Sequence, residues 1–171
     1  MESIPSDKML KFNPDTLNSV RAEFNLDKPG RIEEAIDILE EWIKKQEHFV
    51  KKDFSREYLE KTIITTKGFV ERAKSRMDKL CTFRTLVPNF FQSLEPKRLQ
   101  RIAEILNHAH LPNLTSDNYR VYAMKLISDD RTSSDLSEYY RNIIILSEYV
   151  KAHDYCSGFI LILDYRDINV M

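Results

Sequence analysis

Apolar residues recur at helical spacing along the first half of the chain. Residues 32–43 follow the i, i+3, i+4, i+7 pattern of an amphipathic helix, with acidic residues near the start and lysines at the end, as the helix dipole favours. Shorter stripes of the same kind begin after Asn13 and Ser55, which are expected N-caps. Trp42 is expected to be buried among these helices, and residues 1–13 should form a loosely held arm.

A fourth helix is predicted to follow Gly68, which occupies the position of a left-handed residue at a helix end. Its apolar stripe continues toward Leu86. Pro88 disfavours helical geometry at Val87 and should end the helix there. Four short amphipathic helices joined by tight connections predict a small antiparallel bundle.

Helix and strand patterns alternate in the second half. A short helix is expected to open at Glu95-Pro96, followed by a turn-rich loop over residues 111–118 and a first strand over residues 119–127. Residues 133–151 are long enough for a helix of about five turns. Apolar residues lie around most of its circumference, so this helix should be covered on more than one side.

The most apolar stretch of the chain is FILIL, residues 159–163. Five consecutive large apolar residues between Gly158 and a charged run predict a strand buried on both faces. Because a helix separates this strand from residues 119–127, the two strands should be parallel and joined by a right-handed crossover.

A doubly buried strand needs neighbours on both edges, yet only seven residues follow Asp164. We therefore expect an α/β chain in two parts. Residues 1–95 should form an all-α bundle, and residues 96–171 should form the front part of an incomplete α/β domain.

The composition limits the partners. The chain has 171 residues and a net charge of -1, so it has no overall bias toward nucleic acid, and no nucleic-acid partner is expected. The sequence lacks a signal-peptide pattern and any run of about 18 apolar residues, so a cytoplasmic protein is expected. Cys81 and Cys156 lack metal or redox spacing and should be reduced thiols.

Conventional catalytic signatures are absent from the sequence. Three glycines are too few for a Gly-rich phosphate loop, and no GxSxG motif occurs. His108 and His110, at an expected helix-to-loop junction, lack a third metal ligand at a motif spacing. Asp164 and Asp167 flank the end of the FILIL strand, where α/β proteins often place chemistry, but a solvated strand end is the commoner arrangement. We expect no enzyme, no metal and no cofactor.

Three parts of the chain resemble the CRAL-TRIO (Sec14-like) lipid-transfer family, in its alpha-tocopherol-transfer and retinaldehyde-binding branch. Residues 31–46 (RIEEAIDILEEWIKKQ) resemble the opening helix of the family's N-terminal domain. Residues 67–74 (KGFVERAK) and 84–91 (RTLVPNFF) resemble its next part, particularly in insect members. Residues 158–164 (GFILILD) resemble the first internal strand of the lipid-binding domain. These parts occur in the family's order and extend over about residues 30–167.

The resemblance implies a function. Family members bind one hydrophobic molecule in an apolar cavity floored by the sheet and carry it between membranes, often with phosphoinositide head groups promoting release. It implies a tocopherol, retinoid or carotenoid-like ligand and a transient membrane surface as partners. By motif position, the implied ligand-binding residues come from both strands and the long helix: Met124, Leu126, Tyr140, Ile143, Ile144, Ser147, Phe159, Leu161 and Leu163.

The chain also departs from the family pattern. Residues 60–66 (EKTIITT) stand where the family's third helix usually carries a Leu-Arg-x-Leu-Arg-like segment. The lid helix, the remaining strands and the basic head-group residues would lie beyond Met171. An alternative interpretation is a truncated interaction module, or a non-functional fragment, that binds no ligand. Under either interpretation, the FILIL strand should keep an unpaired edge, and we expect the chain either to self-associate through this strand or to keep the strand loosely ordered.

Overall fold

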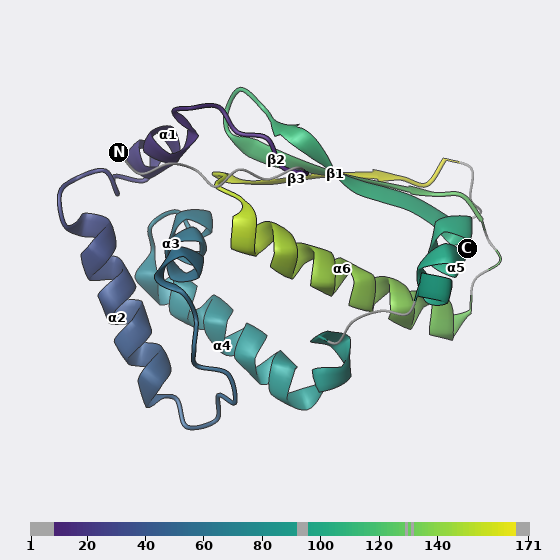
Figure 1. Cartoon of the computed structure of the whole chain (residues 1–171), viewed down its shortest axis with the longest axis horizontal. Helices are drawn as coiled ribbons and strands as arrows, with labels where there is room; N and C mark the ends of the chain where they lie inside the picture. The colour runs from purple at the N-terminus through teal and green to yellow at the C-terminus, as the bar shows by residue number, and fades with distance from the viewer. Residues whose placement is uncertain (1–8, 92–95, 129, 131, 167–171) are drawn as a thin grey trace.

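The computed structural model describes residues 9–91, 96–128, 130 and 132–166. Within these ranges lie six α-helices, one short 3₁₀ helix and a sheet of three strands (Figure 1). The predicted fold class is confirmed at the level of a mixed α/β protein with a helical N-terminal half. Asp167, Glu95 and residues 1–8 of the expected arm lie outside the described residues.

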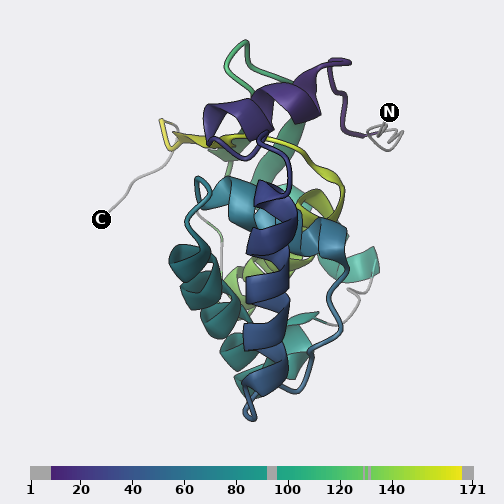
Figure 2. The same cartoon turned by 90° about the vertical axis from the view of Figure 1, so that its left-hand side faces the viewer.

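The four helices of the N-terminal half are α1 (Thr16–Glu23), α2 (Arg31–Lys45), α3 (Arg56–Thr65) and α4 (Val70–Leu86). In Figure 2, α2 runs down the front of this group and α1 lies across its upper end. Their apolar stripes meet in one core, as the periodicity predicts. Tyr155, far along the chain, also packs into this core and joins it to the α/β half.

Local signals set several helix ends as expected, but the N-cap of α1 is Asp15 rather than Asn13, and no described side chain caps that helix. The Ser55 hydroxyl accepts a hydrogen bond from the Tyr58 backbone N–H at 3.2 Å, which caps α3. Gly68 follows α3 with a φ of 76°, and a Cβ at this position would lie 3.2 Å from a backbone oxygen of Phe24. Helix α4 ends at Leu86, two residues before Pro88.

Two expectations for the N-terminal half need correction. Trp42 is only partly buried and packs against Phe49 at a ring distance of 5.6 Å, because the buried stripe of α2 is centred on Leu39 and Ile43. The described part of the arm is held in place rather than loose. Leu10 is buried, and the Lys11 N–H donates to the Pro112 carbonyl at 2.8 Å.

The sheet follows helix α5 (Pro96–Ile105). Strand β1 (Leu106–Leu114) pairs antiparallel with β2 (Tyr119–Leu126), and β2 pairs parallel with β3 (Gly158–Asp164), giving the order β1-β2-β3. Helix α6 (Ser133–His153) connects β2 to β3. The predicted parallel strand–helix–strand unit is confirmed.

Strand β1 was not expected, and it replaces the first half of the loop predicted over residues 111–118. Only the last four residues form the turn, closed by a hydrogen bond from the Asn118 N–H to the Thr115 carbonyl at 3.0 Å. The sequence of β1 contains Pro112 and few β-branched residues, so its strand geometry follows from pairing with β2 rather than from propensity. Pro112 lies where the pairing register shifts, a position that tolerates a missing N–H.

The prediction that β3 is buried on both faces is wrong. Its five large apolar side chains, residues 159–163, are between 41% and 64% exposed. Among the described residues, β3 hydrogen-bonds to β2 along one edge only. A run of five large apolar residues is typical of a strand that is covered on both faces. The elements that would cover β3 are not among the described elements.

Helix α6 lies between the sheet and the bundle (Figure 1), which confirms that it is covered on more than one side. Glu148 of α6 accepts a hydrogen bond from the Tyr58 hydroxyl at 3.2 Å and pairs with Arg84. The Lys61 ammonium donates to the Ala152 carbonyl. None of the described helices has the length and apolar character needed to cross a membrane.

Candidate ligand-binding cavity

A cavity of about 610 Å³ lies between α6 and the inner face of the sheet. Helix α6 supplies one wall through side chains at helical spacing, and β2 and β3 supply the facing wall through alternate residues. Side chains of α3 and α4 line the end nearest the bundle. Most of the lining is apolar, which is the usual character of a small-molecule site.

The structure brings together seven of the nine residues proposed from the sequence. Those lining the cavity are Met124, Tyr140, Ile143, Ser147, Phe159, Leu161 and Leu163. The three from α6 recur every three or four residues, and the three from β3 every second residue. Both repeats keep each set on one face of its element.

Leu126 and Ile144 do not line the cavity. Leu126 faces the same side of the sheet as Met124, but α5 covers it, and it packs with Ile102 and Ile105. Ile144 follows Ile143 on α6, and a helix of 3.6 residues per turn rotates it about 100° away from that neighbour.

Sequence reasoning missed several lining residues. Leu146 and Val150 continue the α6 stripe, and Tyr122 precedes Met124 by two positions, so helical spacing and strand alternation could have identified all three. His110 could not be found in this way, because it belongs to β1, which the sequence did not predict.

His108 lies on β1, not at a helix-to-loop junction, and both of its ring nitrogens have partners. Nδ1 lies 3.1 Å from the Tyr122 hydroxyl, and Nε2 lies 3.0 Å from the Asn142 side-chain amide. Burial lowers the pKa of His108 and raises that of Tyr122 and of Tyr139. In the described part of the chain, no three His, Cys, Asp or Glu side chains are placed to hold a metal ion.

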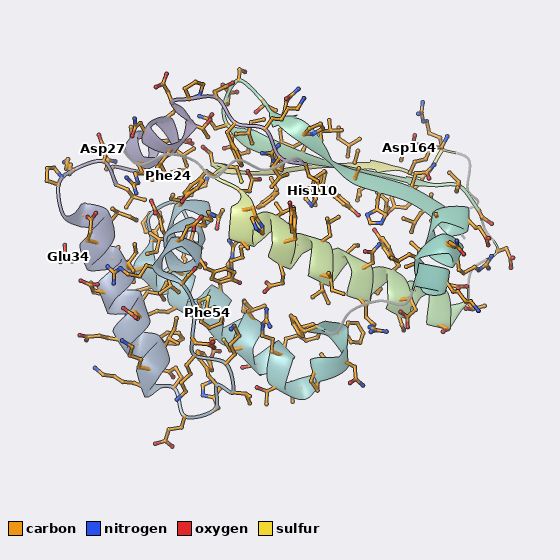
Figure 3. The ribbon with its side chains drawn as sticks, in the orientation of Figure 1. Phe24, Asp27, Glu34, Phe54, His110 and Asp164 are labelled. Atoms are coloured by element: carbon orange, nitrogen blue, oxygen red, sulfur yellow. The ribbon has the colours of Figure 1, made fainter. Side chains whose placement is uncertain are left out.

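His110 lies between the sheet and α6 (Figure 3) and lines the cavity. Its ring packs against Tyr122 at 5.0 Å and Phe159 at 6.2 Å between ring centres. The Nδ1 atom is buried and has no hydrogen-bond partner among the described residues. Burial also lowers the pKa of this imidazole, so it can offer a neutral hydrogen-bonding group to a molecule in the cavity.

The end of the cavity nearest the bundle is basic. Lys61, Thr65 and Arg76 reach it from α3 and α4, and Lys151 reaches it from α6. The Lys151 ammonium lies 4.2 Å from the centre of the Tyr58 ring. Burial lowers the pKa of Lys151 to about 8.

Cys156 also lines the cavity, and burial raises the pKa of its thiol, as it does for Cys81. Both cysteines are free, as expected. Asp164 lies at the end of the sheet remote from the bundle (Figure 3) and accepts hydrogen bonds from Arg166 at 2.7 and 3.0 Å. This pairing lowers the pKa of Asp164 and leaves it an ion-paired carboxylate at a strand end.

Comparison with known protein families and with curated proteins finds no match to this chain. The CRAL-TRIO resemblance and the division near residue 95 therefore stay predictions. The expected absence of enzymatic activity also stays a prediction.

Proposed function

We propose that this chain binds a small hydrophobic molecule in the cavity between α6 and the sheet, and that it takes part in intracellular transfer of that molecule. The observation that supports this most directly is an apolar cavity of about 610 Å³ at the position implied by the family resemblance. Ligand pockets commonly have volumes of roughly 300–1,000 Å³. A tocopherol, retinoid or carotenoid-like molecule is the proposed ligand class.

The exposure of β3 supports the same proposal. Phe159, Leu161 and Leu163 face the cavity and remain 44% to 64% exposed. Covering apolar surface is favourable by roughly 25 cal/mol per Å² removed from water. A hydrophobic ligand lying along these side chains would supply that cover, while His110 Nδ1 could bind a polar group of the ligand.

The proposal includes a transient membrane surface as a partner, with phosphoinositide head groups as a further element taken from the family resemblance. The cavity is bordered by the exposed apolar strand β3, which gives a hydrophobic ligand a short path between the protein and a bilayer.

Native mass spectrometry of the full chain, after exposure to a panel of tocopherol, retinoid and carotenoid, tests the proposal. We expect one molecule retained per chain, and we expect Ile143→Asp to abolish retention, because an unpaired carboxylate in an apolar cavity is costly. Ile144→Asp is the matched control, since Ile144 lies outside the lining and this variant should keep its ligand. Absence of any retained ligand, or undiminished retention by Ile143→Asp, would contradict the proposal.

A second candidate function is an interaction module that pairs with another chain through β3. The supporting observation is that, as far as the described residues go, β3 hydrogen-bonds along one edge and exposes apolar side chains on both faces. Such a strand is a template for pairing with a further strand. In the simplest case the partner is a second copy of this chain, so that the chain self-associates through β3.

A further inference from the structure

The two ends of the cavity differ in charge. Tyr139, Tyr140 and Tyr165 line the end remote from the bundle, where the polar atoms are phenol hydroxyls. The end nearest the bundle instead carries cationic groups from three different helices.

Within the described ranges, one of the cations that line this end pairs with an acidic side chain. The Lys61 ammonium pairs with the Glu57 carboxylate at 2.5 Å and also donates to a backbone carbonyl. Arg76 donates to the Thr65 hydroxyl at 2.8 Å, and Lys151 lies over the Tyr58 ring. Among the described residues, neither Arg76 nor Lys151 forms an ion pair with a carboxylate.

The acidic groups around this end of the cavity are already engaged. Asp154, which also lines the cavity, pairs with Arg120. Glu148 lies one helical turn before Lys151, but its carboxylate pairs with Arg84 and accepts from the Tyr58 hydroxyl. Burial has the largest effect on the pKa of Lys151 and lowers it; the Glu148 carboxylate raises it, and Arg76 lowers it by a smaller effect than either. Arg76 therefore lies close enough to Lys151 for the two cations to repel each other. Within the described part of the chain, two cations that form no ion pair therefore converge where the cavity meets the bundle, and an anion placed there would offset both charges.

We propose that the ligand of this cavity is an amphiphile with an anionic head group, and that Arg76 and Lys151 bind the head. The apolar body lies along the α6 stripe and the inner face of β3, toward Tyr140. This inference rests on the proposed function and specifies the chemical class of the ligand. The head group is a carboxylate or a phosphate monoester.

The dimensions of the cavity suit a long-chain amphiphile. The lining residues of α6 run from Tyr139 to Lys151, which corresponds to about 18 Å of helix at 1.5 Å per residue. Arg76 is exposed whereas Lys151 is partly buried, so the head-group end communicates with solvent on the α4 side.

Paired ligands that share one body and differ in the head test this inference. We would titrate the full chain calorimetrically with retinoic acid against retinol, and with hexadecanoic acid against hexadecan-1-ol. Hexadecyl phosphate is compared with hexadecanoic acid to distinguish a preference for a phosphate head from a preference for a carboxylate head. Each anionic ligand should bind at least about tenfold more tightly than its neutral counterpart, because charge-assisted hydrogen bonds replace neutral ones.

The variants Arg76→Met and Lys151→Met should each weaken binding of the preferred anionic ligand by about tenfold and leave the alcohol within about twofold. Lys151→Arg keeps the charge and should retain anion binding. Lys79→Met is the control for net charge, since Lys79 lies on α4 outside the cavity lining and its loss should change neither affinity. Circular dichroism melting of each variant establishes that it is folded.

The outcomes separate the two proposals. Alcohols that bind as tightly as the anionic ligands, or Arg76→Met and Lys151→Met variants that bind anions like the parent, would overturn the anionic head group while leaving the cavity as a hydrophobic site. Failure of both ligand types to bind would overturn the proposed function itself. A preference for carboxylate or for phosphate supports the inference in either case and identifies the head.

Discussion

Arg120 and Asp154 form a buried ion pair that joins the sheet to the end of α6. The Arg120 Nε and Nη2 atoms donate to the two carboxylate oxygens of Asp154, each at 2.8 Å, and the side chains are 0% and 2% exposed. The remaining nitrogen of Arg120 donates to the carbonyls of Leu111 and Pro112 on β1. One guanidinium therefore links β1, β2 and the C-cap of α6, at the end of the helix that borders the cavity.

Asp154→Asn should destabilise the fold by about 3–5 kcal/mol, since removing one partner leaves a buried charge uncompensated. Urea unfolding followed by circular dichroism measures this. Asp53→Asn is the control, because Asp53 pairs with Lys51 on the exposed surface and its replacement should leave the unfolding midpoint unchanged. An Asp154→Asn variant as stable as the Asp53→Asn variant would show that the buried pair does not hold α6 to the sheet.

The core of the bundle gives a second prediction. Leu39 is fully buried at the centre of the α2 stripe, whereas Trp42 is partly exposed at its side. Leu39→Ala should cost about 2–5 kcal/mol, and Trp42→Ala should cost less, about 1–3 kcal/mol, despite the larger side chain. Thermal melting of the two variants compares them directly. A larger loss of stability for Trp42→Ala than for Leu39→Ala would contradict the position of Leu39 at the centre of the core.

The sequence predicted the elements whose signals are local. The α3 cap at Ser55, the left-handed Gly68 and the stop at Pro88 depend on a few neighbouring residues, so the helix ends could be read without knowing the fold. The seven lining residues were implied by motif position in the family resemblance: three lie on α6, three on β3 and one, Met124, on β2.

What the sequence could not predict depends on long-range pairing. Strand β1 is extended because β2 lies beside it, not because its own residues favour a strand, and so both His110 and the true position of His108 were missed. Leu126 was placed on the correct face, but its cover by α5 arises only in the folded chain. The exposure of β3 likewise depends on which elements lie beside it.

The exposed strand gives a third prediction. If β3 pairs with a second copy of the chain, Ile162→Lys should shift the protein toward monomer, because a lysine at a strand edge disfavours further pairing. Ile162 faces away from the cavity lining, so ligand binding should not change. Sedimentation velocity over a concentration series measures the association. Val50→Lys, which replaces an exposed apolar residue in the bundle, is the control. A parent chain that stays monomeric throughout would contradict pairing through β3.

Lys151 gives a prediction about pH. Burial lowers its pKa from 10.5 to about 8. Between these two pH values the unfolded chain binds a proton at Lys151 that the folded chain does not bind. The contribution of Lys151 to the free energy of unfolding therefore rises with pH in this range. Below about pH 8 the buried charge destabilises the folded chain by up to about 3 kcal/mol.

Lys151→Met should therefore be more stable than the parent at pH 7, and this advantage should shrink as the pH rises toward 10. The comparison is made by urea unfolding of both proteins at each pH, so that titration of neighbouring groups such as Cys81 is common to both and largely cancels. Arg76, Arg84 and Glu148 also act on Lys151 and are present in both proteins. A stability difference that is independent of pH would contradict the lowered pKa.

Methyl NMR of the full chain, titrated with the tightest-binding ligand of the panels, tests most directly whether a hydrophobic molecule occupies the cavity between α6 and β3. We predict intermolecular nuclear Overhauser effects from the ligand to the methyl groups of Ile143, Leu161 and Leu163, which line the cavity, and none to Leu39 in the bundle core. Contacts confined to other surfaces, or the absence of contacts to those three residues at saturating ligand, would contradict binding in this cavity.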